Sequence, residues 1–302
     1  MTRPSRIEIV EVGPRDGLQN ESVHLPPAER IKLIEQLADA GLHHIEAGAF
    51  VSPHWVPQMI GSDEIIQALV QRADLRLPVL VPNLKGYESA RTAGATEIAV
   101  FGAASESFSK KNINCSISES LGRFAEVCAR AIADDVYIRG YISCVLGCPY
   151  EGEVNSAQVA AIARDLVAMG CSEISLGDTI GVGTADKARM LVDACASEIG
   201  IEKIAVHFHD TYGQALANIL ACIELGVTVV DSAVGGLGGC PYAKGSAGNV
   251  ATEDVVYLLE GLDIESGVDL DALIDITEAL STRLGHPPAS RVARARLAKR
   301  QN

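Results

Sequence analysis

Two kinds of hydrophobic pattern alternate along the chain from about residue 7 to residue 262. Short apolar runs rich in Val and Ile, typical of buried parallel strands, occur near 7–12, 43–50, 76–82, 97–103, 136–143, 172–177, 203–209 and 228–233. The segments between them carry apolar residues at helical spacing. In one of them Ile31, Ile34, Leu37 and Ala38 fall on one face. The pattern therefore predicts eight strand–helix units.

A repeated phrase marks the joins between these units. A helical pattern closes on glycine, two to four residues follow, and a strand pattern begins, as in ADAGLHHIEA, RTAGATEIAV, VAMGCSEISL and IELGVTVVDS. Glycine at this place is the usual left-handed cap of a helix. Eight alternating units favour the α/β class and a closed (β/α)8 TIM barrel. An open Rossmann-like sheet is the alternative, but no G-x-G-x-x-G follows the first strand.

We expect residues 1–302 to form a single catalytic barrel domain. The barrel takes about 7–262, and a helical pattern over about 264–302 adds helices beyond the eighth unit. These helices would pack outside the barrel or in an interface. No linker-like stretch divides the chain.

The charge balance narrows the possible partners. The chain has 25 Lys and Arg against 39 Asp and Glu, a formal net charge of -14. Nucleic acids and anionic membranes require clustered cations, so neither is expected as a partner. An anionic substrate must find a local positive site.

Several features predict a cytoplasmic protein. The first residues lack the apolar core of a signal peptide, and no apolar stretch is long enough to span a bilayer. The eight cysteines are scattered through apolar patterns, which indicates reduced thiols. Cys144 and Cys148 have a spacing that zinc sites use, but no second close Cys or His pair accompanies them, so we expect buried thiols.

In barrels of this kind the active site lies at the carboxyl ends of the strands. Polar residues at such ends are therefore candidates for chemistry, and those at strand starts are not. His43 and His44 begin their strand and are expected on the opposite face. The candidates at strand ends are Arg15, Asp16, Glu46, Asn83, Asp178, His207 and His209.

His207 and His209 are two residues apart on a strand, so both should face the barrel axis. Two imidazoles side by side can form half of a divalent-metal site. The alternative is a pair of hydrogen-bonded core histidines, but Asp16 ends at the same face and favours the metal. Asp210 should point elsewhere and either orient a ligand or cap a helix.

The loop GGLGGCPYAKGSAGN, 235–249, follows the eighth strand. Glycine-rich loops over a barrel mouth often act as lids, although a plain connection would look similar. Cys240 lies within it, and a thiol with a pKa of roughly 8.5 can donate a proton to a carbon base at neutral pH. Asn249 either ligates the metal or caps the next helix; the residues alone leave both open.

The strand ends carry the motifs VEVGPRDGLQNE, FVSPHWVPQM, PNLKGYE, FGAASESFSKKNINCS, GYISCVLGCPYEG, EISLGDTIGVGT, HFHDTYGQALAN and GLGGCPYAKGSAGN. Together these motifs resemble one known family, hydroxymethylglutaryl-CoA lyase. The resemblance covers about residues 7–262.

The resemblance implies a role for each matching position. Asp16, His207, His209 and Asn249 would bind Mg²⁺ or Mn²⁺, and Arg15, Glu46 and Cys240 would be catalytic. In the mechanism we expect, Asp16 or His207 accepts the substrate hydroxyl proton, and Arg15 binds the thioester oxygen. We expect Arg15 and Asp16 to serve as separate groups and not as an ion pair.

The implied reaction is cleavage of (S)-3-hydroxy-3-methylglutaryl-CoA to acetoacetate and acetyl-CoA in leucine degradation, by a homodimer. The alternatives are a condensing synthase like the homocitrate and isopropylmalate synthases, a lyase for a longer 3-hydroxy-3-alkylglutaryl-CoA, and a non-catalytic metal- or CoA-binding barrel. Cys240 favours the lyase over the synthases, which generally lack the GLGGCPY segment. Lys110 and Lys111 are either contacts to CoA phosphates or solvated loop lysines.

Two positions depart from the pattern that is frequent in the family. Ala49 stands where Ser is common, and Ser-Ala-Val-Gly replaces Ser-Val-Ala before GLGGCPY. We expect the loss of a hydroxyl near Glu46 to alter how the acyl group is held.

Overall fold

The computed structural model describes residues 3–239 and 248–300. Its strands run parallel in one sheet with the order β2-β1-β9-β8-β7-β6-β5-β4-β3. Their bounds are β1 (Glu8–Glu11), β2 (His44–Ile45), β3 (Gly48–Ala49), β4 (Val79–Leu80), β5 (Glu97–Ala103), β6 (Tyr137–Ser143), β7 (Glu173–Asp178), β8 (Ile204–Phe208) and β9 (Val229–Ser232).

The sheet closes on itself through the strand predicted over 43–50. That strand is interrupted into β2, which pairs with β1, and β3, which pairs with β4. At the interruption Glu46 N donates to Glu11 O, and Ala47 N donates to Pro78 O. Because consecutive residues bond to opposite edges, the ends of the sheet are joined. The predicted TIM barrel is confirmed, and the Rossmann-like alternative is excluded.

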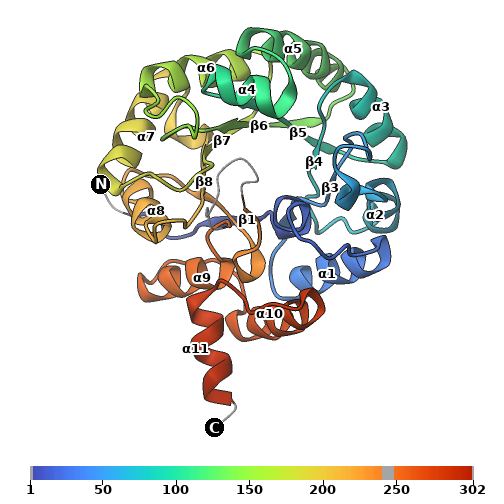
Figure 1. The fold of residues 1–302 in the computed structure, drawn as a ribbon, viewed down its shortest axis with the longest axis vertical. Coiled ribbons are helices and arrows are strands. Elements are labelled where there is room, and N and C mark those ends of the chain that lie inside the picture. Colours follow the sequence, from blue (N-terminus) through green and yellow to red (C-terminus); the bar gives the residue numbers. More distant parts are fainter. Residues whose placement is uncertain (1–2, 240–247, 301–302) are drawn as a thin grey trace.

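Helices surround the strands in a ring (Figure 1). The helices of the barrel are α1 (Pro27–Asp39), α2 (Ser62–Leu69), α3 (Leu84–Ala93), α4 (Glu106–Ile113), α5 (Ile117–Ala133), α6 (Ser156–Ala168), α7 (Ala185–Ile199), α8 (Ala215–Ile223) and α9 (Thr252–Gly261). Two more follow, α10 (Leu270–Leu284) and α11 (Arg291–Arg300), and α11 projects away from the ring (Figure 1). The predicted extra C-terminal helices are therefore present. Short turns are η1 (Gly13–Gly17), η2 (Pro57–Met59), η3 (Ile201–Lys203) and η4 (Val234–Gly236).

The glycines of the repeated phrase have the backbone conformation that the sequence predicted. Gly41, Gly94, Gly170 and Gly226 have φ values of 100°, 102°, 112° and 106°, which L side chains rarely adopt. Each lies between the end of a helix and the start of the next strand. The phrase therefore works as expected, since glycine ends the helix and the apolar run then enters the sheet.

The amino end of the barrel carries a charged network far from the predicted chemistry. His44 is buried at the start of its strand, with Nδ1 2.8 Å from Glu8 Oε1. Arg76 bonds to both Glu8 and Glu97 at this end. This confirms the expectation that His44 lies away from the site. Among the described residues, no helix has the length and apolar character needed to cross a membrane.

Candidate active site

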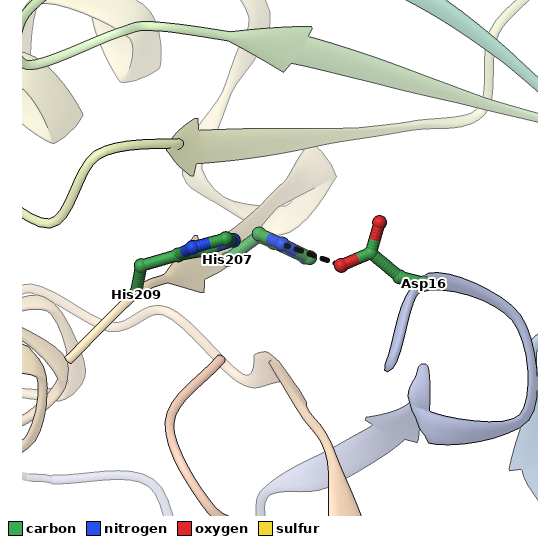
Figure 2. A group of neighbouring side chains, drawn as sticks. All are labelled: Asp16, His207 and His209. Carbon is green, nitrogen blue, oxygen red and sulfur yellow. Dashed lines mark ion pairs between the residues drawn. The ribbon is translucent and has the colours of Figure 1, made fainter. Parts of the chain in front are cut away.

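Three predicted metal ligands converge inside the barrel. Asp16, His207 and His209 each present one ligand atom, and these atoms lie within 4.8 Å of one another (Figure 2). Asp16 lies in η1 and His207 lies in β8. His209 directly follows Phe208, the last residue of β8. One carboxylate and two imidazoles are a donor set that suits divalent metals. The side chains present therefore fit the divalent metal that the sequence predicted.

The local fold of η1 explains how Asp16 reaches the histidines. Val12 O accepts hydrogen bonds from both Arg15 N and Gly17 N, which closes a single π-helical turn after β1. A Cβ on Gly13 would lie 2.5 Å from Glu11 Oε1, so any larger residue would have to displace the Glu11 carboxyl. The turn lets neighbouring side chains point into the same space, which neighbours on a strand cannot do.

Arg15 and Asp16 form an ion pair, so the expectation that they would not was wrong. Arg15 NH1 lies 3.0 Å from Asp16 Oδ1, and Arg15 Nε lies 2.7 Å from Glu46 Oε2. The π-helical turn places both side chains on one side, and burial leaves the guanidinium little contact with water. The buried cation is therefore neutralised by two carboxylates from two strand ends.

The surroundings shift the pKa values of Asp16 and Glu46 in opposite directions. Burial acts to raise the pKa of Asp16, but Arg15 and the two histidines hold that pKa below its ordinary value. Burial raises the pKa of Glu46, and Arg15 offsets only part of this effect. The lowered pKa favours the ionised form of Asp16, which a metal ligand or proton acceptor requires.

Asn249 lies beside Asp16, as the family resemblance implied. Its Nδ2 donates to Asp16 Oδ2 at 2.8 Å and to Leu237 O at 3.1 Å. The backbone around Asn249 pairs with the end of β8, because Val250 N donates to Phe208 O. The alternative role of capping α9 does not match these bonds. The amide nitrogen of Asn249 therefore faces Asp16. To bind a metal, the side-chain amide would have to turn so that Oδ1 faces the space between Asp16 and the histidines.

Glu11 is a buried residue of this region that the sequence analysis missed. Its carboxyl accepts hydrogen bonds from Gly13 N, Val234 N and Thr252 Oγ1 at 2.8, 2.9 and 2.6 Å. It therefore joins η1 to η4 and to the start of α9. A Glu inside an apolar strand was the signal that could have found it, but nothing in the sequence identified its partners.

The other polar residues near strand ends have structural contacts. Asp178 accepts from Val182 N and Gly183 N, and Asn83 Oδ1 accepts from Gly86 N at the start of α3. Asp210 Oδ1 accepts from Ala215 N at the start of α8, which confirms its helix-capping alternative.

Cys144 and Cys148 are both buried, as predicted. Cys148 Sγ lies 2.9 Å from Ser105 Oγ. Ala49 is buried too; its N–H donates to Ser62 Oγ, and it does not line the cavity described next. The altered acyl contact that we expected at this position stays a prediction without a structural contact to support it.

The cluster opens into a cavity of about 1020 Å³. Arg15, Asp16, His207 and His209 line it, together with Lys110 and Lys111, which lie on α4 and not in a loop. Arg123 of α5 also lines the cavity, and among its described lining residues Asp16 is the one carboxylate. Cys240, the predicted proton donor, lies outside the described residues.

Comparisons with known proteins identify the family of the chain. A family model described as HMGL-like matches residues 6–280. The 3-hydroxy-3-isohexenylglutaryl-CoA/hydroxymethylglutaryl-CoA lyase of Pseudomonas aeruginosa is 57% identical over 299 residues, which cover 99% of this chain and 100% of that protein.

Solved structures of this kind superpose closely. The crystal structure of hydroxymethylglutaryl-CoA lyase from Pseudomonas aeruginosa has a TM-score of 0.96 at 57% identity, covering 99% of this chain and 100% of the other. An HMG-CoA lyase from Acinetobacter baumannii in complex with coenzyme A and 3-methylmalate has a TM-score of 0.92 at 36% identity, covering 98% and 97%. These matches confirm the resemblance inferred from the motifs. The chain belongs to the HMGL-like family, that of the hydroxymethylglutaryl-CoA lyases.

Proposed function

We propose that this protein is a carbon–carbon lyase that cleaves (S)-3-hydroxy-3-methylglutaryl-CoA to acetoacetate and acetyl-CoA, with Mg²⁺ or Mn²⁺ as cofactor. The observation that carries the proposal is that Asp16, His207 and His209 line one cavity together with Arg15, which pairs with the buried Glu46. The close relatives with lyase names support the same reaction. Leucine degradation is the pathway that would supply this substrate.

The chemistry requires three events. The C3 hydroxyl loses its proton, the C2–C3 bond breaks with its electrons moving onto the thioester as an enolate, and C2 gains a proton. A divalent metal held by Asp16, His207, His209 and Asn249 would polarise the C3 hydroxyl and orient the free carboxylate.

The chain's own residues serve each event in turn. The hydroxyl proton goes to Asp16 or to His207, whose Nε2 lies 4.0 Å from Asp16 Oδ2. Arg15 donates to the thioester oxygen, where negative charge grows; such donors typically contribute about 3 kcal/mol. Glu46 orients the Arg15 guanidinium through the ion pair between its carboxylate and Arg15 Nε. Cys240 then gives its thiol proton to C2.

The charge of the cavity supports an acyl-CoA substrate. The whole chain has a net charge of -14, yet Arg15, Lys110, Lys111 and Arg123 line the cavity. A CoA thioester carries phosphates at one end and a carboxylate at the other, so local cations offset the repulsion of the remaining surface. We place the phosphates near Lys110 and Lys111 on α4.

A lyase for a longer 3-hydroxy-3-alkylglutaryl-CoA is the second candidate. The Pseudomonas aeruginosa relative is named for both the isohexenyl and the methyl substrate. The cavity lining also includes the apolar residues Leu80, Phe101, Phe108 and Phe124, against which a longer chain could pack.

One coupled assay tests these functions. Purified protein with Mg²⁺ or Mn²⁺ should release acetoacetate from the methyl substrate, and chelation should abolish the release. A 3-isohexenyl substrate in the same assay measures acyl breadth. Acetyl-CoA with a keto acid, in the absence of both 3-hydroxyacyl-CoA substrates, tests for the synthase. Metal binding without turnover of any substrate would contradict the proposal and favour a non-catalytic barrel.

The matched control is a carboxylate that also follows the carboxyl end of a strand but lies outside the cluster of Asp16, His207 and His209. Asp210 pairs with Arg291 and caps α8. Asp210→Asn should keep metal-dependent turnover, whereas Asp16→Asn should lose it. Equal loss in both variants would mean that the measurement reports general damage to the barrel mouth.

We further propose a cytoplasmic homodimer in which each chain is one domain. The larger of two hydrophobic clusters in the described residues contains buried side chains from Ile7 to Ala293, which supports one domain. The described cysteines are all buried, which suits reduced thiols. The helices beyond the barrel, α10 and α11, offer surface for a second copy. Light scattering with size-exclusion chromatography measures the oligomeric state, and a monomer would contradict the dimer.

A further inference from the structure

A buried polar network lies behind His207, and apart from His207 itself it involves no residue that the proposed chemistry uses. Asp231, at the third position of β9, is 1% exposed. Its Oδ1 accepts from Arg139 NH2 at 2.6 Å, and its Oδ2 accepts from Arg139 NH1 at 3.0 Å and from Ser175 Oγ at 2.8 Å. His207 Nδ1 lies 3.1 Å from the same Oδ2.

Arg139 is held in turn, so Asp231 has a fixed position. The Arg139 Nε donates to Glu173 Oε1 at 2.5 Å, and NH1 also donates to the Tyr141 hydroxyl at 2.8 Å. The members of the network come from β6, β7, β8 and β9, four adjacent strands of the barrel. A side chain fixed from four strands has little freedom to rotate.

The donors around Asp231 decide which proton His207 carries. A guanidinium has only donors, and both Asp231 oxygens face it, so the carboxyl acts as a pure acceptor. The ring nitrogen at 3.1 Å must then be the donor, which puts the imidazole proton on Nδ1. In the neutral ring the lone pair is left on Nε2. That nitrogen points toward Asp16, with 4.0 Å between His207 Nε2 and Asp16 Oδ2.

We propose that Asp231 is a positioning residue that fixes His207 as the Nδ1–H tautomer, with the Nε2 lone pair aimed at the space shared with Asp16 and His209. The orienting role rests on the proposed metal site, whereas the tautomer follows from the chain's own hydrogen bonds. Carboxylates behind metal-binding histidines typically change metal affinity by about 10- to 100-fold when they are removed.

The first test measures the proton directly in the wild-type protein without metal. Nitrogen-15 chemical shifts of labelled histidine, assigned with a His207→Gln variant, identify which ring nitrogen carries hydrogen in the neutral ring. A proton on Nδ1 supports the proposal, and a proton on Nε2 overturns it. This test needs neither turnover nor a variant of Asp231.

The second test compares Asp231→Asn with Ser175→Ala. Asparagine keeps the shape of Asp231 but can present an amide hydrogen to His207, so His207 should show mixed tautomers. The Mn²⁺ dissociation constant, measured by calorimetry, should rise about 10- to 100-fold. Ser175→Ala removes one bond to the same oxygen without affecting the imidazole proton, and should keep both the tautomer and the affinity near wild type.

The outcomes separate this proposal from the proposed function. If Asp231→Asn keeps a single Nδ1–H tautomer and wild-type Mn²⁺ affinity, the positioning role is wrong. If Ser175→Ala weakens Mn²⁺ as much as Asp231→Asn does, the network acts only as a structural support, and the positioning role is again overturned. If the wild type binds Mn²⁺ with the expected tautomer but releases no acetoacetate from either acyl-CoA substrate, the lyase proposal fails while the role of Asp231 stands.

Discussion

Replacing Glu11 with glutamine should remove a pH dependence of stability that is built into the end of β1. Glu11 is fully buried and has neutral donors around its carboxyl, from Gly13, Val234 and Thr252. Burial raises its pKa from 4.5 to about 7, and the nearby Glu253 adds to the effect. The ionised form is therefore less stable in the folded chain than in the unfolded chain.

The sign and size of the effect follow from linkage. Because the folded pKa lies above the unfolded one, the stability from Glu11 is fully present below about pH 4.5 and is lost as pH rises through about 7. One pKa unit corresponds to about 1.4 kcal/mol. Ionisation of Glu11 should therefore lower the free energy of unfolding of the wild type by about 2.5 kcal/mol between about pH 5 and pH 8.

Glutamine fits the same contacts without titrating. Its Oε1 can accept from Gly13 N and Val234 N, and its amide can donate to the Thr252 hydroxyl. When the pH is raised from about 5 to about 8, the free energy of unfolding of Glu11→Gln should therefore rise by about 2.5 kcal/mol relative to that of the wild type.

Urea unfolding followed by circular dichroism at several pH values measures the difference. Glu260→Gln, on the exposed side of α9, is the matched control and should keep the wild-type pH profile. Parallel profiles for wild type and Glu11→Gln would refute the reasoning, because they would mean that Glu11 does not titrate differently in the folded chain.

Three further predictions concern the candidate site. Asp16→Ala and His207→Ala should each lose Mn²⁺ binding in calorimetry while keeping their circular dichroism spectrum; retained binding would place the metal elsewhere. Cys240→Ser should lose most acetoacetate release while keeping metal content and fold, and near-normal turnover would exclude Cys240 as the acid. Gly238→Ala should weaken Mn²⁺ binding and destabilise the fold by more than about 1 kcal/mol, since φ is 114° and the new Cβ would lie 2.7 Å from Asn249 Nδ2. Unchanged affinity in that variant would argue against Asn249 as a ligand.

The sequence predicted the barrel well where local rules act alone. Glycine caps depend only on the backbone of one residue, and all four predicted caps were found. The strand over 43–50 was predicted as one piece, but it breaks at Glu46 because β2 and β3 pair with different neighbours. Such a break depends on barrel closure, and closure involves residues far apart in the chain.

Helix faces show a similar limit. Ile31 was predicted to lie on the buried face of α1, but it is only half-buried, and Arg30 is fully buried instead. The Arg30 guanidinium donates to the carbonyls of Gln58, Ile60 and Ala47. An arginine counts as polar in any hydrophobic pattern, so only the tertiary acceptors explain its burial.

The rule that chemistry lies at the carboxyl ends of barrel strands identified the residues of the candidate site. It did not identify the buried residue that holds His207. Polar residues at strand ends included Asp16, Glu46, His207 and His209, which the structure brings together. Residues in the middle of strands were outside that rule, and Asp231 was missed for this reason. The rule also selected Asp178, whose bonds are to the backbone of its own loop.

Glu11 and Asp231 show why residue type and burial alone could not have assigned roles inside this barrel. Both are buried carboxylic acids on adjacent strands, β1 and β9, and both accept hydrogen bonds at each oxygen. Arg139 beside Asp231 holds the pKa of that carboxyl below its ordinary value although burial acts to raise it, whereas the neutral donors around Glu11 leave its pKa near 7. Asp231 can therefore remain an acceptor for His207 across the neutral pH range, and Glu11 cannot stay ionised there without destabilising the fold. The charge of one partner, which comes from a distant strand, separates a residue that holds His207 from one that ties together loops.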